Sequence, residues 1–168
     1  MKNSRFFFFL ILLCFLSVPQ MVNCSQKTEE INPCSLIATE KLISIFPVLQ
    51  KAEKQTVGPN TVCNYLDKFG IPALIISVSQ AGPHARDTLS ILGPGYVIEE
   101  IAGLGDEAAV AIQQANPKFG LQEGVAALHI KKGDISLNLS FPRINIQVND
   151  PKFEQVKILA AEMLDKLS

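Results

Sequence analysis

The sequence lacks the short motifs on which most enzyme classes depend. It contains no Gly-x-Ser-x-Gly nucleophile elbow and no Gly-Lys-Ser/Thr phosphate loop. It has only two histidines, His84 and His129, and no close-spaced cysteine pair of the Cys-x-x-Cys type, which disfavours a histidine-based or zinc site. We therefore expect no catalytic set, no metal site and no cofactor.

Concentrated positive charge and long apolar runs are also scarce. Beyond Lys131-Lys132 there is no cluster of basic residues, whereas nucleic-acid binding needs a concentrated basic face. After residue 18 no stretch of 18 or more apolar residues occurs, so no later segment has the length and apolarity of a membrane span. These two absences argue against a nucleic-acid partner and against a membrane-spanning segment after residue 18.

The N-terminus, in contrast, has the pattern of an export signal. Lys2 and Arg5 precede the apolar run 6–18, FFFFLILLCFLSV, whose 13 residues are too few to span a bilayer. We predict that residues 1–23 are a signal peptide and that the protein is exported. Removal of this segment takes away two of the 15 basic residues and leaves 16 acidic ones, a formal charge of −3.

The residues after the apolar run indicate how the mature chain starts. No small-x-small cleavage site is present, but MVNC ends in Cys24 and is similar to the relaxed lipobox of spirochaetes, with Asn23 in place of the usual small residue. We predict that Cys24 carries a lipid that anchors a bacterial protein to the outer membrane or the periplasmic face. Residues 24–31 would form a polar tether. Simple secretion without a lipid is the alternative.

The four cysteines are separated by position. Cys14 lies inside the predicted signal peptide and Cys24 is the predicted lipid anchor, which leaves Cys34 and Cys63 in an exported chain. We predict that these two form a disulfide, worth roughly 3–4 kcal/mol in the chain-entropy model. If Cys24 is not lipidated, it is an odd thiol and an intermolecular bond becomes possible.

The pattern of apolar and polar residues predicts that residues 32–168 form a single α+β domain. The apolar periodicity predicts an antiparallel sheet of about five to six strands with helices packed on it. A polar linker is expected at 48–60 and a loop at 116–124. The expected helices are 33–46 (capped by Asn32), 83–92 and 151–167, and the expected strands are 61–67, 73–80, 96–105, 106–114, 124–134 and 135–141.

GLGDEA, residues 103–108, is the stretch that most resembles a site. It lacks the third glycine of a dinucleotide fingerprint and the alternating acids of a calcium loop. Asp106 and Glu107 are adjacent, and adjacent residues of a strand point to opposite faces, so they are not expected to act on one substrate. Gly103 and Gly105 predict a turn. The alternative is that these four residues, together with His84, line a ligand site.

Each of the two histidines can be interpreted as a structural residue, and His84 can also be interpreted as a catalytic one. In a helix, His84 and Asp87 would share a face, and an imidazole held by Asp87 or Asp106 could serve an envelope hydrolase. The simpler interpretation of His84 is a polar helix surface. His129 falls on the polar phase of its strand, which predicts a solvated side chain or a cross-strand partner rather than a ligand.

Several of these segments together resemble a family. The Asn-Pro-Cys opening at 32–34, the strand cysteine in VCNY, the GLGDEA turn, the LHIKKGD hairpin and the terminal helix ending in Leu-x-Lys-Leu are similar, in that order, to small exported bacterial lipoproteins of uncharacterised function. The likeness covers residues 32–167. Asn32 replaces the usual Asp, and Ala38 stands where a Thr cap is common. The resemblance implies a cysteine-bridged envelope domain that faces outward from a membrane, with no catalytic residues to carry over.

The leading expectation is therefore a non-enzymatic cell-envelope lipoprotein. Its membrane contact would be the lipid on Cys24, and its domain would bind an unidentified protein or small molecule. The competing expectations are an envelope hydrolase that uses His84 with a carboxylate, and a secreted effector or inhibitor.

Overall fold

The computed structural model describes residues 31–58, 60–80, 82 and 84–167, which belong to one compact unit, Ile31–Ser168. The predicted signal peptide 1–23, Cys24 and the tether up to residue 30 lie outside the described residues. In chain order the unit contains a 3₁₀ turn (Pro33–Ser35), α2 (Thr39–Ile45), β1 (Leu49–Val57), β2 (Asn60–Asp67), β3 (Pro72–Gln80), α3 (Ala85–Ser90), β4 (Tyr96–Glu100), β5 (Glu107–Gln113), a second 3₁₀ turn (Pro117–Phe119), β6 (Gly124–Lys132), β7 (Ile135–Ser140) and α4 (Pro151–Asp165).

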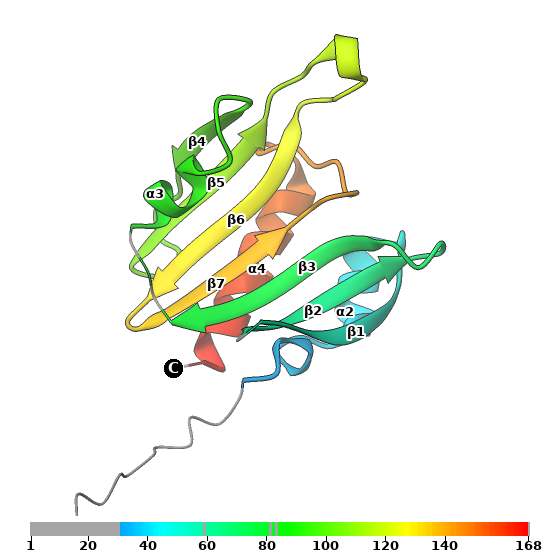
Figure 1. Ribbon diagram of the computed structural model, residues 1–168. Helices are drawn as coiled ribbons and strands as arrows, with labels where there is room; N and C mark the ends of the chain where they lie inside the picture. The colour runs from blue at the N-terminus through cyan, green and yellow to red at the C-terminus, as the bar shows by residue number, and fades with distance from the viewer. Residues whose placement is uncertain (1–30, 59, 81, 83, 168) are drawn as a thin grey trace, which may run out of the picture. The chain divides into compact units, whose positions relative to one another are not determined.

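The strands form one antiparallel sheet in the order β1-β2-β3-β7-β6-β5-β4 (Figure 1). The predicted α+β class with an antiparallel sheet is confirmed. The described residues form seven strands, however, and not the five to six expected. The apolar β3 lies inside the sheet, between β2 and β7, as its composition indicates.

The additional strand is β1, in the segment expected to be a polar linker. Its residues are exposed except for the buried Leu49 and the half-buried Ala52, because β1 is an edge strand with β2 as its neighbour. Charged side chains on an edge strand discourage pairing with another chain. They also remove the apolar alternation by which a strand is recognised in a sequence, so the expectation of a linker was wrong.

The first helix is shorter than predicted. Asn32 does act as a cap, since its side chain accepts a hydrogen bond from the Cys34 backbone N–H at 3.2 Å, but it caps a 3₁₀ turn. The α-helix starts only at Thr39. Leu36 and Ile37 between the two are both buried, and an irregular backbone allows these consecutive side chains to reach the core together. Tertiary burial thus divides a segment that its periodicity assigns to one helix.

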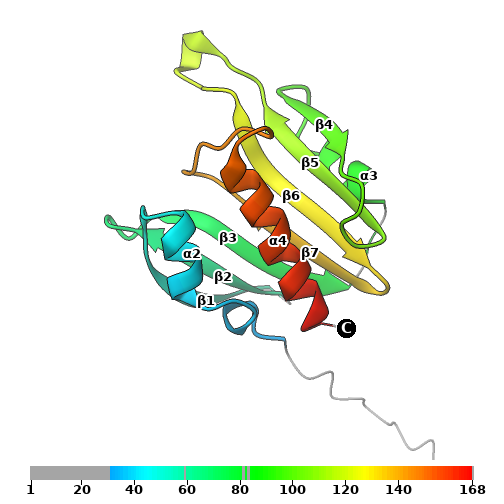
Figure 2. The same ribbon diagram turned by 180° about the vertical axis from the view of Figure 1, so that it is seen from behind.

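One face of the sheet carries the main core. Figure 2 shows α2 and α4 lying across this helix-covered face. Phe153, Val156, Leu159, Ala160 and Met163 of α4 are buried there against apolar residues of the strands, as the predicted stripe requires. The burial of this stripe orients the sheet and leaves its other face to the remaining elements.

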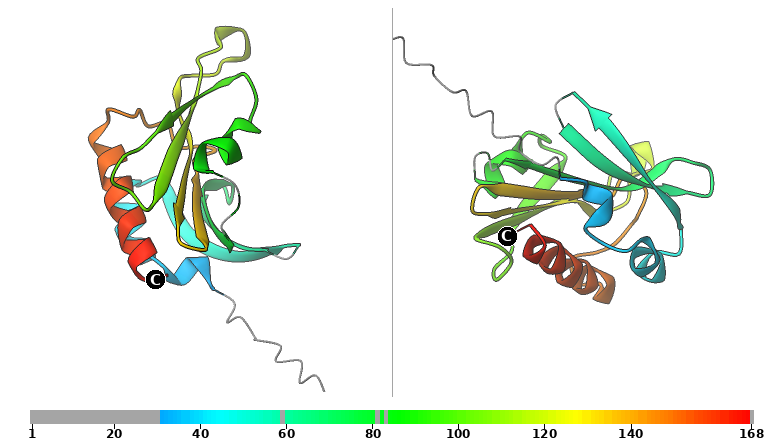
Figure 3. Two further views of the ribbon diagram at one scale, coloured as in Figure 1. Left: turned by 90° about the vertical axis from the view of Figure 1, so that its left-hand side faces the viewer. Right: turned by 90° about the horizontal axis from the view of Figure 1, so that it is seen from below.

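The opposite face, which we call the open face, is covered only in part. The short helix α3 lies on it over β4, β5 and β6, and Figure 3 shows α3 and α4 on opposite sides of the sheet. The contact is made by small side chains, because Ala109 and Ala111 of β5 and Ala127 of β6 allow α3 to approach closely with Ala85 and Leu89. Among the described residues, no helix lies on the open face of β1, β2, β3 and β7.

The predicted disulfide is present. Cys34 of the first 3₁₀ turn and Cys63 of β2 are bonded, with Cα atoms 5.0 Å apart. Cys63 is fully buried and points to the helix-covered face. The bond therefore attaches the start of the described unit to the interior of the sheet.

Candidate functional site

GLGDEA forms the predicted turn between β4 and β5. Gly103 and Gly105 have positive φ angles of 77° and 65°, which glycine adopts without steric cost. At Gly105 there is a second requirement, because a Cβ atom would lie 2.5 Å from the carbonyl oxygen of Lys131 on β6. The predicted strand 96–105 consequently ends at Glu100, and the glycines serve backbone geometry.

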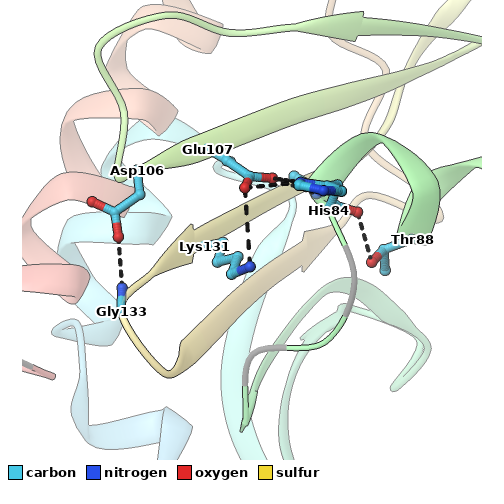
Figure 4. Close-up of polar contacts among 7 residues, drawn as sticks. His84, Thr88, Asp106, Glu107, Lys131 and Gly133 are labelled. Atoms are coloured by element: carbon cyan, nitrogen blue, oxygen red, sulfur yellow. Dashed lines mark hydrogen bonds and ion pairs between the residues drawn. The ribbon is translucent and has the colours of Figure 1, made fainter.

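The two acids of the turn point to different partners. The Asp106 carboxylate accepts a hydrogen bond from the Gly133 backbone N–H at 2.7 Å, and the Asp106 N–H donates to the Lys131 carbonyl at 2.8 Å (Figure 4). Asp106 therefore supports the β6–β7 turn. Glu107 begins β5 and faces the open side of the sheet, so the two carboxylates do not form a pair.

Glu107 is the centre of a small polar cluster with His84. The His84 Nδ1 atom lies 3.0 Å from the Glu107 Oε1 atom, the Ala85 N–H donates to Oε2 at 3.2 Å, and Lys131 Nζ lies 3.9 Å from Oε1 (Figure 4). The backbone N–H of Ala85, followed by the hydrogen bond from His84, lowers the pKa of Glu107. The cluster is an ionised carboxylate that holds an exposed imidazole at the start of α3.

This arrangement corrects the partner predicted for His84. The residue occupies the position before α3, outside the helix, so it does not share a helical face with Asp87. Asp106 is also excluded as its partner by the contact with Gly133. The Thr88 hydroxyl donates its hydrogen to the His84 carbonyl oxygen at 3.2 Å and not to the imidazole. Within the part of the chain that the structure describes, the cluster contains an oriented base with no nucleophile hydrogen-bonded to it.

His129 is a buried cross-strand residue. It pairs with Asn138 on β7 and Ala109 on β5, and only 6% of its surface is exposed. The cross-strand role is as predicted, whereas the alternative of a solvated side chain is wrong. Burial lowers the pKa of His129, and the hydrogen bond with Asn138 opposes that effect. The imidazole is therefore held in its neutral form in the sheet.

A metal centre has no support in the described part of the chain. Across residues 31–58, 60–80, 82 and 84–167, no group of three or more His, Cys, Asp or Glu side chains could hold an ion. The same part of the chain contains no helix long and apolar enough to cross a membrane.

The open face contains a hollow of about 510 Å³, which we call the Tyr96 hollow. Leu92, at the end of α3, and Tyr96 border it on one side, and Leu121 and Gln122 of the loop before β6 also line it. Its remaining lining comes from the strand ends and the segment after β7, including Ile75, Gln113, Ser140, Phe141, Arg143 and Asn145. The volume is within the range of small-molecule sites.

A second hollow of about 370 Å³, the Asn64 hollow, lies on β1, β2 and β3. Asn64 and Ser77 are among its polar side chains, and Asn64 Nδ2 donates to Gln55 Oε1 at 2.7 Å. Ile75 lines this hollow and the Tyr96 hollow alike. The two hollows therefore meet at Ile75 on the half of the sheet that no helix covers.

The sequence patterns did not identify these hollows. Their residues come from all seven strands of the described sheet and from three connecting segments, and no local motif joins them. One sequence pattern could have indicated this face of the sheet. Polar residues alternate along two interior strands, at Ser77 and Ser79 of β3 and at Asn138 and Ser140 of β7. Of the predicted ligand-lining residues, Glu107 and His84 meet, Asp106 lies apart, and the two glycines form the turn.

Comparisons with known protein families, with curated proteins and with solved structures produced no significant match.

Proposed function

We propose that this protein is a cell-envelope lipoprotein of the family that its sequence resembles, anchored through Cys24, and that its domain binds a small ligand or a partner without catalysis. The observation that carries the binding role is the pair of hollows that meet at Ile75. A face of a sheet that is left uncovered, hollowed and lined by amide and hydroxyl groups is suited to hydrogen-bonded recognition.

Both the lining and the size of the hollows support a polar, uncharged ligand. Asn64, Ser77 and Ser140 offer donors and acceptors, while Ile75 and Tyr96 offer apolar surface. Arg143, the cation of the Tyr96 hollow, is already engaged, because its Nε lies 3.3 Å from the Asp67 carboxylate. The recognition of a ligand would therefore depend on neutral groups.

Native mass spectrometry of the protein taken from its own envelope tests the anchor and the ligand together. We expect an acyl mass on Cys24, a deficit of two hydrogens that reductant removes, and a retained small molecule. Cys24→Ala should release a folded protein from the membrane. A bare chain in the medium would contradict the anchor and favour a secreted effector or inhibitor.

The position of the ligand is tested by a matched pair of variants. Ile75→Trp fills the place where the two hollows meet, and we expect it to lose the retained molecule. Ile158→Trp places the same side chain at an exposed site of α4, on the other side of the sheet, and should keep it. Equal retention by both variants would count against the open face as the binding site.

A second candidate function, an envelope hydrolase, is favoured by one contact, the His84–Glu107 pair. A carboxylate bonded to Nδ1 orients an imidazole as it does in many general bases. This function predicts turnover of a generic ester, peptide or glycan that His84→Ala abolishes and Asp87→Ala preserves. If the folded protein is inactive on all three substrate types, the hydrolase is excluded for them.

A further inference from the structure

A tetrapeptide of the form Lys-Phe-Gly-aliphatic occurs twice in this chain, as Lys68–Ile71 and as Lys118–Leu121. The first forms the turn between β2 and β3, and the second lies in the loop before β6. We call these two segments the Phe69 tip and the Phe119 tip. Nothing in the hollows or in the His84 cluster accounts for their similarity.

The two tips also share three local features. Phe69 is 68% exposed and Phe119 is 70% exposed, although phenylalanine is among the residues most often buried. The glycine that follows each of them has a positive φ angle, 75° at Gly70 and 66° at Gly120. The preceding lysine lies over each ring, with Nζ 5.0 Å from the Phe69 centroid and 5.9 Å from the Phe119 centroid.

Hydrogen bonds fix both tips in these conformations. The Asp67 carboxylate accepts from the backbone N–H groups of Phe69 at 2.8 Å and Ile71 at 3.0 Å. In the other tip, Asn116 and Leu121 exchange two backbone hydrogen bonds of 2.9 and 3.0 Å. Each phenylalanine is thus held in water by a closed loop, and the exposure is a property of the fold.

The tips lie at the same end of the sheet. Ser140 of β7 pairs with Ile75 of β3 on one side and with Ala127 of β6 on the other, so the start of β3 and the start of β6 are at one end. Figures 1 and 2 show both loops projecting beyond the strands there. Further exposed apolar side chains accompany the two tips: Val48, Ile71, Ile91, Leu92 and Leu121.

The lysines of the tips stand outside the contact ion pairs of the described residues, although the charge of Lys68 acts on the neighbouring Asp67 carboxylate. Within the described ranges, neither Lys68 nor Lys118 forms an ion pair with a carboxylate. Elsewhere in the same ranges lysines are commonly paired, as in Lys41 with Glu162, Lys51 with Glu53, Lys131 with Glu107, Lys132 with Asp165 and Lys157 with Glu154. An exposed aromatic ring beside an unpaired cation is therefore repeated at two places on a chain of net negative charge.

We propose that the Phe69 and Phe119 tips bind the surface of an anionic lipid bilayer. The rings would enter the boundary between headgroups and acyl chains, where aromatic side chains are favoured, while the lysine ammonium groups remain at the phosphates. A bilayer fits two separate, protruding tips better than a protein does, because a soft surface accepts both without the contiguous complementary patch of a protein interface. The rings and ammonium groups that make this contact do not line the hollows, although Gly120 and Leu121 of the Phe119 tip border the Tyr96 hollow, and the contact does not depend on a lipid on Cys24.

Vesicle sedimentation tests this proposal. The probe is the chain from Cys24 onward with Cys24→Ser, mixed with phosphatidylcholine vesicles that contain or lack phosphatidylglycerol. We expect binding to the anionic vesicles only, weakened when salt is raised from about 0.1 M to about 0.5 M. Lys68→Gln with Lys118→Gln should lower the partition coefficient roughly tenfold or more and remove most of the salt dependence.

The aromatic contribution is measured with a second set of variants. Phe69→Ala with Phe119→Ala should also reduce partitioning at least roughly tenfold. Ile158→Ala, which removes an equally exposed apolar side chain from α4, and Lys152→Gln, which removes an exposed lysine of α4, should leave it unchanged. Thermal unfolding of every variant verifies that the fold is intact, since all the changed side chains are exposed.

Two results would overturn the proposal. One is a folded protein that stays in the supernatant with both kinds of vesicle, which would leave a protein partner as the occupant of the tips. The other is vesicle binding that the double phenylalanine variant retains in full. Ile75→Trp separates this proposal from the ligand role, because it should bind vesicles as the unsubstituted chain does even where the retained ligand is lost.

Discussion

Gly103 and Gly105 share a positive φ angle and differ in their surroundings. No atom lies within 4 Å of the Cβ position at Gly103, whereas at Gly105 that position meets the Lys131 carbonyl oxygen at 2.5 Å. The two sites of one turn therefore separate the effect of a left-handed backbone from the effect of the space for a side chain.

We expect Gly103→Ala to cost about 1–2 kcal/mol through its backbone conformation alone. Gly105→Ala should exceed that by about 1–3 kcal/mol, because the new methyl group also displaces β6. Urea unfolding of the two variants measures the difference. Equal losses would mean that Lys131 moves aside freely and that the turn is not packed against β6.

The disulfide gives a second prediction at this scale. Cys34 and Cys63 are 29 residues apart in the sequence, and removing the crosslink restores conformational entropy to the unfolded chain. Cys34→Ala should therefore lower the stability by roughly 3–4 kcal/mol, and reductant should have a similar effect on the unsubstituted protein. Calorimetry measures the change, with Cys24→Ala as the control that leaves the melting temperature unaltered. An unchanged melting temperature for Cys34→Ala would contradict a stabilising role for the bond.

The role of a single residue could be predicted where it depends on its sequence neighbours alone, or where the other residues of its type were assigned to different roles. The turn glycines and the Cys34–Cys63 bond belong to this group. The partner of His84 was not predictable, because Glu107 lies 23 residues away and is brought to α3 by the pairing of β5. The burial of His129 likewise depends on the neighbouring strands β5 and β7. Its place in the alternation of polar and apolar residues along β6 does not reveal that burial.

Among the elements, α4 and β1 are opposite cases. The apolar stripe of α4 recurs at helical spacing and is buried as a whole, so its sequence predicts its position on the sheet. β1 is exposed on nearly its whole length, and its strand conformation comes from hydrogen bonds to β2. A strand that buries almost nothing shows no apolar alternation in its sequence, which is why the sequence did not predict this strand of the sheet.

α4 also allows a test with adjacent residues. Leu159 is buried against the sheet and Ile158 is 60% exposed. Leu159→Ala should cost about 2–5 kcal/mol because it opens a cavity in the main core. Ile158→Ala should stay within about 0.5 kcal/mol of the unsubstituted protein. Chemical denaturation measures both, and a large loss for Ile158→Ala would mean that this face of α4 is covered in solution.

Below about pH 8, the shifted pKa values of His129, Asp67 and Glu107 make the stability of the molecule depend on pH. The folded-state pKa of His129 is lowered by burial, so the unfolded chain binds a proton first as the pH falls through about 6.5. Backbone N–H groups of Ile71 and Phe69, with Arg143 and Lys68, lower the pKa of Asp67, and Glu107 is lowered in a similar way. For these carboxyls the unfolded chain binds protons first below about pH 4.

Stability should therefore be greatest above about pH 7 and decline in two stages on acidification. His129→Gln, which does not titrate and retains a polar partner for Asn138, should flatten the stage between about pH 7 and pH 5 and leave the acidic stage in place. Urea midpoints between pH 8 and pH 3 measure both stages. A first stage of undiminished size in His129→Gln would assign it to another group.

The strand order has a consequence for how the chain reaches this fold. β1, β2 and β3 are neighbours in sequence, as are β4, β5, β6 and β7, and only the pairing of β3 with β7 joins the two sets. Each set can form by local hairpin closure, while the β3–β7 seam brings together Gln80 and Ile135 across the intervening chain. We therefore expect the docking of the two meanders along this seam to be the slow, non-local step of folding. Because the disulfide joins the 3₁₀ turn before β1 to β2, and so involves neither β7 nor the seam, oxidation can precede that step and does not have to wait for it.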